Sequence, residues 1–546
     1  MRRQEAAAKR EAESSRRKER HATRQEAMAS GDMDSHRPSL GAVAILGAGV
    51  SGLAAAYRLQ ANGAAVTVFD TQESVGGKVQ SVRQDRIIWE KGANTMAATE
   101  ADVNNLIDHL NLRDKQQFPL QQSKRYIVRD GKPIKLPGDP LALIASNLLS
   151  PHGKLRIMLE PFIWKKRAHM QYEAQNPGQA FQDESVGEFM ERHFGREVVD
   201  YLVDPFLAGT SGSDPSSVSI RHTFPELWAL EERYGSIIVG AILSGFQKRS
   251  KSSQSTVSQK LPQKKRRGSF SFVGGLQTLA NALVTEIGER NLKLDASVTV
   301  LACNQQGNPS RDNWTISYLR TGSDKIMHQF EQHFDAVITT MPLHNFREVQ
   351  IKKDGKPYSI HYIPPVVYEP ISVLVTAFRN EDVKRPLEGF GVLVPSKEQS
   401  QKFQTLGTLF SSSMFPDRAP PDQTLFTTFI GGSRNPSLCA TSKEELLDVV
   451  LQDLHRLLGV EGKPTFVRHT FWEKAFPRYD LGYQNILTSL EKLERDLPGL
   501  CYAGNHKGGL AVGKCLISGL KAAEQVLTYL ESSGSRKLFT MALSPD

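Results

Sequence analysis

Three glycines at the spacing of a phosphate-binding turn are the residues that most directly predict chemistry. Gly47, Gly49 and Gly52 follow the apolar run 43–46 and precede a helix-like segment. At this GxGxxG spacing the first glycine permits a tight turn, the second lets the backbone approach a pyrophosphate, and the third lets helix and strand pack closely. The phosphates then rest at a helix N-terminus. The predicted dinucleotide contacts are Gly47, Ala48, Gly49, Val50, Ser51 and Gly52.

An acidic residue at the end of the next predicted strand narrows the choice of dinucleotide. Asp70 closes the strand predicted over 66–69, where a carboxylate can accept hydrogen bonds from both hydroxyls of an unphosphorylated ribose. This favours FAD or NAD over NADP. Glycine-rich segments at 74–78 and 89–95 follow, and glycine is used where the backbone must come near a ligand. A bound flavin therefore fits better than an exchangeable nicotinamide. The alternative is a glycine-rich turn in an ordinary α/β core.

Length and composition limit the class of protein. A chain of 546 residues is too long for one core, so two or three domains are expected. Hydrophobic residues at 39% and charged residues at 23% are globular values, and no apolar run approaches the ~20 residues that span a bilayer. No CxxC pair is present, so we expect neither a metal site nor disulfides, and a reducing compartment. The cysteines, predicted to be buried thiols, are Cys303, Cys439, Cys501 and Cys515.

The net charge of +9 is compatible with a nucleic acid, an anionic membrane surface or an acidic substrate as partner. Much of this charge lies in segments 1–37 and 248–267. For 248–267 we favour a solvated basic loop over a nucleic-acid site, because no aromatic side chains alternate with its charges. Segment 1–37 is basic and contains serine, as organellar transit peptides do, but its glutamates depart from their acid-poor composition.

The middle of the chain predicts a hairpin and then a helical region. Residues 123–135 predict a hairpin that turns at Asp130–Gly131, with Arg125 on one of its faces. Residues from about 140 to 246 predict mostly helices. Within them, an apolar helix face is flanked by Trp164 and basic residues. Such a face can lie in a membrane interface or pack against the rest of the protein, and the sequence leaves both open.

The second half of the chain predicts strands and a return to the cofactor. Strands are expected over 293–300 and 334–340, and glycine-rich segments over 500–513 precede a helix over 515–530. The cofactor domain is thus predicted to be discontinuous. Separate β-rich segments indicate an antiparallel sheet; they are 372–378, 389–395, 406–412 and 425–430.

These motifs together resemble the flavin-containing amine oxidase superfamily and, within it, the protoporphyrinogen oxidases of the plant mitochondrial type, over residues 41–532. Lys78 departs from the family pattern, since relatives outside plants usually have arginine there, and lysine lacks the bidentate fork. The resemblance rests on Gly47–Gly52, Gly76–Lys78, Gly92–Thr95, Ser269–Gly275, Gly389–Pro395, Thr405–Phe410, Trp472–Pro477 and Tyr502–His506.

The resemblance implies an α/β fold with a discontinuous Rossmann-like FAD-binding domain, an antiparallel-sheet substrate domain and an inserted helical membrane-binding domain. The expected boundaries are 1–40 (flexible basic segment), 41–120 (first FAD-binding segment), 121–139 (substrate-domain hairpin), 140–247 (helical, membrane-binding), 248–267 (disordered basic loop), 268–345 (second FAD-binding segment), 346–470 (substrate-domain sheet), 471–532 (third FAD-binding segment) and 533–546 (tail).

The same resemblance implies an activity. FAD would oxidise protoporphyrinogen IX to protoporphyrin IX in three two-electron steps, with hydride passing to flavin N5 and O2 as final acceptor, giving hydrogen peroxide. The cofactor carries this chemistry, so no catalytic side chain and no metal are expected. The implied setting is haem or chlorophyll biosynthesis at a mitochondrial membrane surface, with the chloroplast as the alternative. No nucleic-acid partner is expected, and a homodimer is left open.

Residue roles carried over from the family follow its motifs. Arg125 would bind a substrate propionate, with an exposed hairpin charge as the alternative. Phe410 would stack on the substrate, with sheet core as the alternative. The other implied substrate residues are Asn94, Leu387, Gly389, Leu393 and Gly209. The further implied FAD residues are Asp70, Thr71, Lys78, Gly92, Ala93, Asn94, Thr95, Val298 (a buried strand residue in the alternative), Asn505, Leu510, Ala511 and Val512.

A related flavin oxidase acting on a polyamine is the competing interpretation. A cationic amine substrate would require carboxylates near the flavin, whereas the hairpin supplies Arg125, a charge of the opposite sign. A non-enzymatic flavoprotein-like scaffold is a third interpretation, and the intact set of cofactor motifs disfavours it. The sequence therefore favours the porphyrinogen oxidase.

Overall fold

The computed structural model describes residues 40–138, 140–163, 183–253, 268–304, 313–322 and 326–541. The basic segment predicted over 1–37, and Trp164 with the basic residues after it, lie outside the described residues. The loop predicted over 248–267 differs at its start, because helix α12 (Ile237–Ser253) continues through residues 248–253. Lysine, arginine and glutamine are good helix formers, which accounts for the extension. The rest of that segment lies outside the description.

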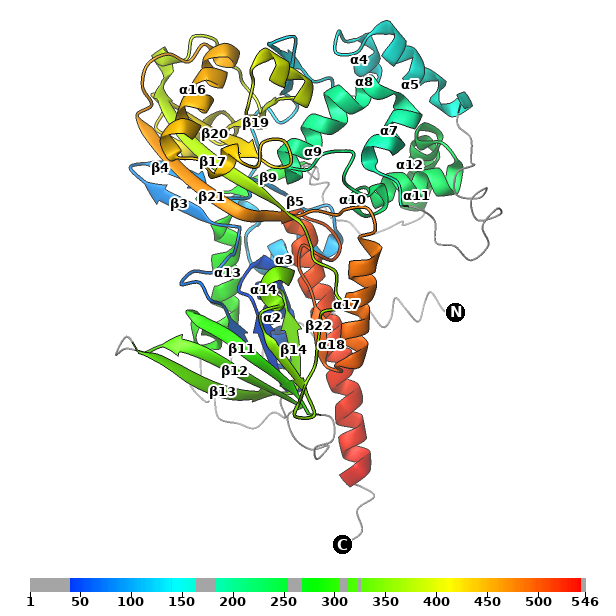
Figure 1. The fold of residues 1–546 in the computed structure, drawn as a ribbon, viewed down its shortest axis with the longest axis vertical. Coiled ribbons are helices and arrows are strands. Elements are labelled where there is room, and N and C mark those ends of the chain that lie inside the picture. Colours follow the sequence, from blue (N-terminus) through cyan, green and yellow to red (C-terminus); the bar gives the residue numbers. More distant parts are fainter. Residues whose placement is uncertain are drawn as a thin grey trace. The chain divides into compact units, whose positions relative to one another are not determined.

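A parallel sheet forms the centre of the cofactor region, and its strands come from distant parts of the chain (Figure 1). All its neighbouring strands pair in parallel, as βαβ connections require. The order across the sheet is β10 (Leu292–Lys293), β2 (Ala65–Phe69), β1 (Ala42–Leu46), β14 (Ala336–Thr339) and β22 (Leu500–Tyr502). The predicted α/β class is confirmed.

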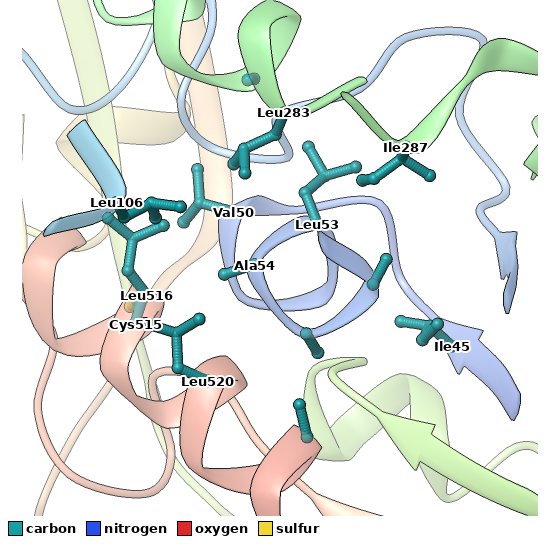
Figure 2. Packing of buried hydrophobic residues seen from close by; sticks show 14 of the residues in the cluster. Ile45, Val50, Leu53, Ala54, Leu106, Leu283, Ile287, Cys515, Leu516 and Leu520 are labelled. Atoms are coloured by element: carbon teal, nitrogen blue, oxygen red, sulfur yellow. The ribbon is translucent and has the colours of Figure 1, made fainter. Parts of the chain in front are cut away.

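One side of this sheet is covered by helices whose apolar faces meet. Figure 2 shows Leu53 of α2 near Leu283 of α13, and Leu516 of α18 near Leu106 of α3. The small Ala54 lets α18 approach α2, since both helices belong to one buried cluster. The helices are α2 (Val50–Ala61), α3 (Ala101–His109), α13 (Gln277–Ile287) and α18 (Val512–Met541).

The opposite side packs against a second sheet and two helices. Phe69 and Val337 of the parallel sheet share a buried cluster with Trp314 and Leu490. The second sheet has the order β13 (Met327–Phe334), β12 (Trp314–Thr321), β11 (Ala296–Cys303), β15 (Gln350–Lys353) and β16 (Lys356–Pro357); the helices are α14 (Leu343–Phe346) and α17 (Gln484–Asp496).

A seven-stranded sheet corresponds to the predicted antiparallel segments. Its pairs are antiparallel except β7 with β18, which run parallel. The predicted hairpin is present as β7 and β8, and Asp130 and Gly131 both have positive φ, as a two-residue type I′ turn requires. The order is β21 (Phe466–Pro477), β17 (Tyr368–Arg379), β20 (Gln423–Gly431), β19 (Gly407–Phe410), β18 (Gly391–Leu393), β7 (Arg125–Arg129) and β8 (Lys132–Lys135).

The two faces of this sheet have different coverings. Helix α16 (Lys443–Leu458) covers one face through a cluster that includes Leu454 and Phe426. The other face packs against Trp89 and Ala208. The remaining small elements are β3 (Ser81–Gln84), β4 (Ile87–Glu90), β5 (Met96–Ala97), β6 (Gln116–Gln117), β9 (Ser269–Phe272) and α15 (Ser411–Met414).

Between the hairpin and β9 the described chain is helical. A buried cluster that includes Phe189, Leu207 and Ile237 holds these helices together. Among the described helices, none has the length and apolar character that crossing a bilayer would need. The helices are α4 (Pro140–Ala145), α5 (Pro151–Ile163), α7 (Val186–Phe194), α8 (Arg196–Val198), a π-helix (Val199–Val203), α9 (Asp204–Ser211), α10 (Ile220–Thr223), α11 (Pro225–Tyr234) and α12.

Candidate active site

The glycine turn between β1 and α2 has no room for a side chain at Gly47 or Gly52. Gly47 has φ +109°, and a Cβ on Gly52 would lie 1.9 Å from the Gly47 carbonyl oxygen. Gly49, the N-cap residue of α2, has no side chain that could accept a hydrogen bond. It therefore leaves the first backbone N–H groups of the helix uncapped. The turn and the helix N-terminus together form a backbone cradle for an anion.

Asp70 braces this turn from the end of β2. Its Oδ2 accepts a hydrogen bond from the Ala48 backbone N–H at 2.6 Å, and its Oδ1 accepts one from Gln72 at 2.9 Å. Burial raises the pKa of Asp70, while these backbone N–H groups act in the opposite direction. The carboxylate thus fixes the turn, a role the sequence analysis missed. Its predicted bond to a ribose stays a prediction, as does the neighbouring role of the exposed Thr71.

Lys78 reaches across to the seven-stranded sheet. Its Nζ donates a hydrogen bond to the Lys474 carbonyl oxygen on β21 at 2.8 Å, and burial lowers its pKa to about 8. The backbone of Lys78 also lies against Gly92, where a Cβ would be 2.4 Å from the Lys78 carbonyl oxygen. Two of the three glycine-rich segments are therefore in direct contact. The predicted contact of Lys78 with a cofactor phosphate stays a prediction.

The loop that follows Gly92 joins the cofactor region to the seven-stranded sheet. Asn94 Nδ2 donates to the Gly92 carbonyl oxygen at 2.9 Å. Asn94 also lines a small cavity with Thr427 and Ser411, on the sheet face opposite α16. The half-buried Ala93 and Thr95 flank it. The predicted place of Asn94 between cofactor and substrate is compatible with this contact but stays a prediction.

The C-terminal glycine-rich segment is held by buried aromatic side chains. Tyr479 donates to the Asn505 carbonyl oxygen at 2.5 Å, and the Tyr368 hydroxyl lies 2.6 Å from His506 Nε2. Burial lowers the pKa of His506 to about 3, so this imidazole is neutral. Leu510 and Ala511 follow and lead into α18 at its first residue, Val512. Sequence reasoning missed this network because its members are far apart in the chain.

Val298 lies on β11, beside β2 in the cofactor region. Its side chain is buried, and the pairing of β11 with β12 shifts register between Val298 and Val300. A bulge of this kind leaves backbone groups outside the regular ladder. This geometry is compatible with the predicted contact between the Val298 backbone and FAD, which stays a prediction.

Arg125 begins β7 opposite Gly391 of β18. Its guanidinium lies over the Phe390 ring at 4.7 Å from the centroid, and among the described residues no carboxylate pairs with it. Burial lowers its pKa, yet a guanidinium stays charged at neutral pH. The strand pairing therefore places beside β18 an exposed cation that has no carboxylate partner among the described residues. This exposure agrees with the alternative of an exposed hairpin charge, and the propionate contact stays a prediction.

An apolar wall continues from this cation along β18. Leu393 pairs with Ile127, and a Cβ on Gly209 of α9 would lie 2.4 Å from Leu393 Cδ2. Arg125, which pairs with Gly391, thus lies two residues along the sheet from Leu393, and Leu393 contacts Gly209. The roles of these three residues toward a substrate stay predictions. Gly389 has no room for a side chain, because a Cβ there would lie 2.3 Å from the Lys124 carbonyl oxygen.

Phe410 lies on the other face of the same sheet. Its side chain is 1% exposed and contacts Phe426 and Tyr126 beneath α16. Val392 belongs to this cluster too, and successive residues of a strand point to opposite faces, so Phe410 and Leu393 point apart. Leu387 packs against the same cluster. Phe410 therefore lies in the sheet core, as the alternative interpretation expects. Its stacking on the substrate stays a prediction.

Comparison with known proteins identifies the family. Residues 50–527 match the flavin containing amine oxidoreductase family. The chain belongs to that family. It is 51% identical over 495 residues to protoporphyrinogen oxidase 2, chloroplastic/mitochondrial, of Arabidopsis thaliana, covering 91% of this chain and 95% of the relative. It is also 51% identical over 490 residues to the mitochondrial protoporphyrinogen oxidase of Nicotiana tabacum, covering 90% and 95%.

Solved structures share the fold at low identity. A crystal structure from Exiguobacterium sp. 255-15 is 20% identical with a TM-score of 0.68, over 90% of this chain and 100% of that one. Cyclohexylamine oxidase from Brevibacterium oxydans IH-35A is 16% identical with a TM-score of 0.59, over 90% and 99%. These likenesses support the fold of a flavin amine oxidoreductase.

The residues present fit the FAD that this family contains. A pyrophosphate requires close backbone approach, and the crowded Gly47 and Gly52 leave only backbone at the turn. Gly49 and Gly76 form a β-bridge, which brings a second glycine-rich segment beside the first. Two glycine-rich segments thus lie side by side at the turn, where their backbone can approach a dinucleotide.

Proposed function

We propose that this protein oxidises protoporphyrinogen IX to protoporphyrin IX with FAD, in three two-electron steps with O2 as acceptor, in haem and chlorophyll biosynthesis. The observation that carries this proposal is the pairing of β7 with β18, which sets Arg125, without a carboxylate partner in the described part of the chain, beside an apolar wall. The relatives named protoporphyrinogen oxidases share half of their residues with this chain over nearly their whole length.

The substrate and this surface are chemically complementary. Protoporphyrinogen IX is a large apolar macrocycle with two propionates on one edge. An apolar slot with a cation at one end satisfies both features. Arg125 binds a propionate through two parallel N–H···O bonds, and Leu393 and Gly209 contact the macrocycle. A polyamine, which carries positive charge, would be repelled by Arg125.

The cofactor residues position rather than react. The backbone of residues 47–52 and the N-terminus of α2 bind the pyrophosphate, and Asp70 holds the turn in place while it binds the ribose. Lys78, residues 92–95, Val298, Asn505 and residues 510–512 complete the cofactor contacts. Bound flavin supplies the two-electron acceptor. His506, which bonds Tyr368, anchors the C-terminal segment.

An apolar face on α5 and α12 is proposed to lie in a membrane interface without crossing the bilayer. Leu155, Met158 and Phe162 recur at helical spacing on α5, and Phe162 is 83% exposed. Lys154 and Arg156 on the same helix are cationic, as at anionic lipid surfaces. We define the α5–α12 apolar face as Leu155, Met158, Leu159, Phe162, Ile242 and Leu243.

The proposed compartment is the mitochondrion, with the chloroplast as the alternative. The relatives with 51% identity are named mitochondrial or chloroplastic/mitochondrial. Fusing residues 1–40 to a fluorescent reporter tests N-terminal targeting. Colocalisation with mitochondria or plastids is expected, and a diffuse cytosolic signal would contradict it. Light scattering of the detergent-solubilised protein tests whether it is a homodimer.

Oxygen uptake by the flavin-loaded protein tests the activity. We expect uptake with protoporphyrinogen IX and none with a polyamine such as putrescine. Arg125→Ala should raise KM about 10- to 100-fold with unchanged flavin content, since a charged hydrogen bond contributes about 1.5–3 kcal/mol. Lys135→Ala, which removes another cation from the same hairpin, is the control. An unchanged KM in Arg125→Ala removes that residue from the site.

A further inference from the structure

Helix α9 is attached to the seven-stranded sheet at its N-terminal end by a buried ion pair. Asp204, its first residue, lies 3.2 Å from Arg434, with side chains only 10% and 7% exposed. Asp204 Oδ2 also accepts a hydrogen bond from the Ser396 backbone N–H at 2.6 Å. Arg434 Nη1 donates to the Val394 carbonyl oxygen at 2.6 Å. The pair therefore joins α9 to the residues immediately after Leu393 on β18.

The C-terminal end of α9 has a second attachment. Gly212 ends the helix in the left-handed conformation, and its carbonyl oxygen accepts a hydrogen bond from the Ser433 backbone N–H at 2.7 Å. A Cβ on Gly432 would lie 2.2 Å from that oxygen. Since Ser433 and Arg434 are consecutive, one short segment of chain holds both ends of α9.

Gly209 and Leu393 face each other between these two attachments. Gly209 has no side chain, and the 2.4 Å from its ideal Cβ position to Leu393 Cδ2 shows that the surfaces already touch. Any displacement of α9 from β18 changes this spacing directly. The two attachments are thus the features of the fold that fix the spacing.

We propose that Asp204 and Arg434 form a positioning pair that sets the separation of α9 from β18, and so determines which porphyrinogens fit beside Leu393. This inference rests on the proposed function. Neither Asp204 nor Arg434 is among the residues proposed to contact the substrate. Their burial makes the pair sensitive to substitution, because removing one charge leaves the other without compensation in a site from which water is largely excluded.

Asp204→Asn in the flavin-loaded full chain tests this positioning role. We compare kcat/KM for protoporphyrinogen IX with kcat/KM for coproporphyrinogen III, a porphyrinogen with four propionates instead of two. Loosening α9 should raise KM for protoporphyrinogen IX about tenfold. It should also raise the ratio of kcat/KM for coproporphyrinogen III to kcat/KM for protoporphyrinogen IX at least about fivefold, because the fit of a substrate in its pocket discriminates by such factors. Flavin content and kcat for protoporphyrinogen IX should change less than about twofold.

Gly209→Ala should shift the ratio the other way, because its methyl group would lie 2.4 Å from Leu393 Cδ2 and would displace that side chain into the space proposed for the substrate. Asp448→Asn makes the same chemical change on an exposed carboxylate of α16, and it should leave the ratio unchanged. If Asp204→Asn does not fold, Arg434→Lys is measured instead. Lysine keeps the positive charge but lacks the planar guanidinium that bonds the Val394 carbonyl oxygen and Asp204 together.

Opposite shifts in the two variants support the proposal. Equal losses for both porphyrinogens in Asp204→Asn, or in Arg434→Lys, would show a merely structural pair and overturn it. A ratio shift of the same size in Asp448→Asn would also overturn it. An unsubstituted, flavin-loaded protein that oxidises neither porphyrinogen contradicts the proposed function itself, and the inference with it.

Discussion

Individual residues of the glycine turn are constrained by backbone contacts rather than by side-chain chemistry. Gly52 lies against the Gly47 carbonyl oxygen, and Asp70 bonds the N–H of the residue between the glycines, Ala48. A side chain at Gly52 would displace the turn, and loss of the carboxylate would release it. The cofactor site therefore depends on steric fit at one position and on hydrogen bonding at another.

Gly52→Ala should abolish flavin retention and lower the free energy of unfolding by about 1–3 kcal/mol, the usual cost of overpacking. The reason is the 1.9 Å distance from its Cβ position to a backbone oxygen, which no side-chain rotation can relieve. Flavin absorbance of the purified protein and urea unfolding measure the two effects. Gly245→Ala, where nothing lies within 4 Å, is the control, and equal loss in both would contradict this account.

Asp70→Ala should weaken FAD binding about tenfold and destabilise the protein by about 1–2 kcal/mol, because two backbone N–H groups lose their acceptor. Flavin fluorescence during dilution measures the dissociation constant. Asp70→Asn keeps one oxygen acceptor and should lie between the wild type and Asp70→Ala. Full retention of FAD in Asp70→Ala would show that the turn needs no brace.

At the scale of elements, a buried carboxylate links the two helices of the α5–α12 apolar face. Glu160 of α5 accepts hydrogen bonds from the Ser236 hydroxyl at 2.5 Å and the Ile237 N–H at 2.9 Å, and so binds the start of α12. Its Oε1 lies 2.9 Å from His193 Nδ1, and His193 Nε2 lies 3.5 Å from Glu231. These helices thus share one polar cluster beneath an apolar surface.

This cluster should make stability depend on pH. Burial alone would lower the pKa of His193, but its bonds to Glu160 and Glu231 outweigh burial and raise it. A raised pKa means that the stabilisation is fully present below the unfolded-state value of about 6.5 and is lost as pH rises through the folded-state value. Urea unfolding from pH 6 to 9 should show this decline, and His193→Gln should remove it. An identical pH profile in His193→Gln would contradict the assignment.

Phe162→Glu should reduce flotation of the protein with anionic liposomes about tenfold or more, because Phe162 is the most exposed side chain of the α5–α12 apolar face. Activity in detergent should be unchanged. Leu120→Glu, at a 70% exposed leucine outside that face, is the control. Equal flotation of Phe162→Glu and wild type would mean that another surface binds lipid.

At the scale of the whole molecule, local signals were predictable and distant pairings were not. The Gly47–Gly52 turn and the Asp130–Gly131 hairpin each lie within a short stretch, so spacing and turn chemistry suffice. Tyr368 and His506 are 138 residues apart, and only the folded chain brings them together. The face occupied by Phe410 depends on the register of β19 in the sheet, which no local pattern specifies.

Truncation before Leu500 should abolish flavin binding, since it removes β22 from the parallel sheet and α18 from its contact with α2. Flavin absorbance and the thermal transition of the purified fragment measure this. Truncation after Ser532 keeps the buried residues of α18 up to Leu530 and should retain FAD. A yellow, cooperatively melting protein that ends at Gly499 would contradict this prediction.

The parallel sheet needs a strand from the far end of the chain, because β14 gains its second neighbour, β22, only when residues near 500 have been synthesised. A ribosome-bound or partly translocated chain therefore lacks the finished nucleotide cradle. If the chain crosses an organellar envelope unfolded, it crosses without its flavin, and cofactor loading must take place on the inner side. Holoenzyme formation then requires FAD within the organelle.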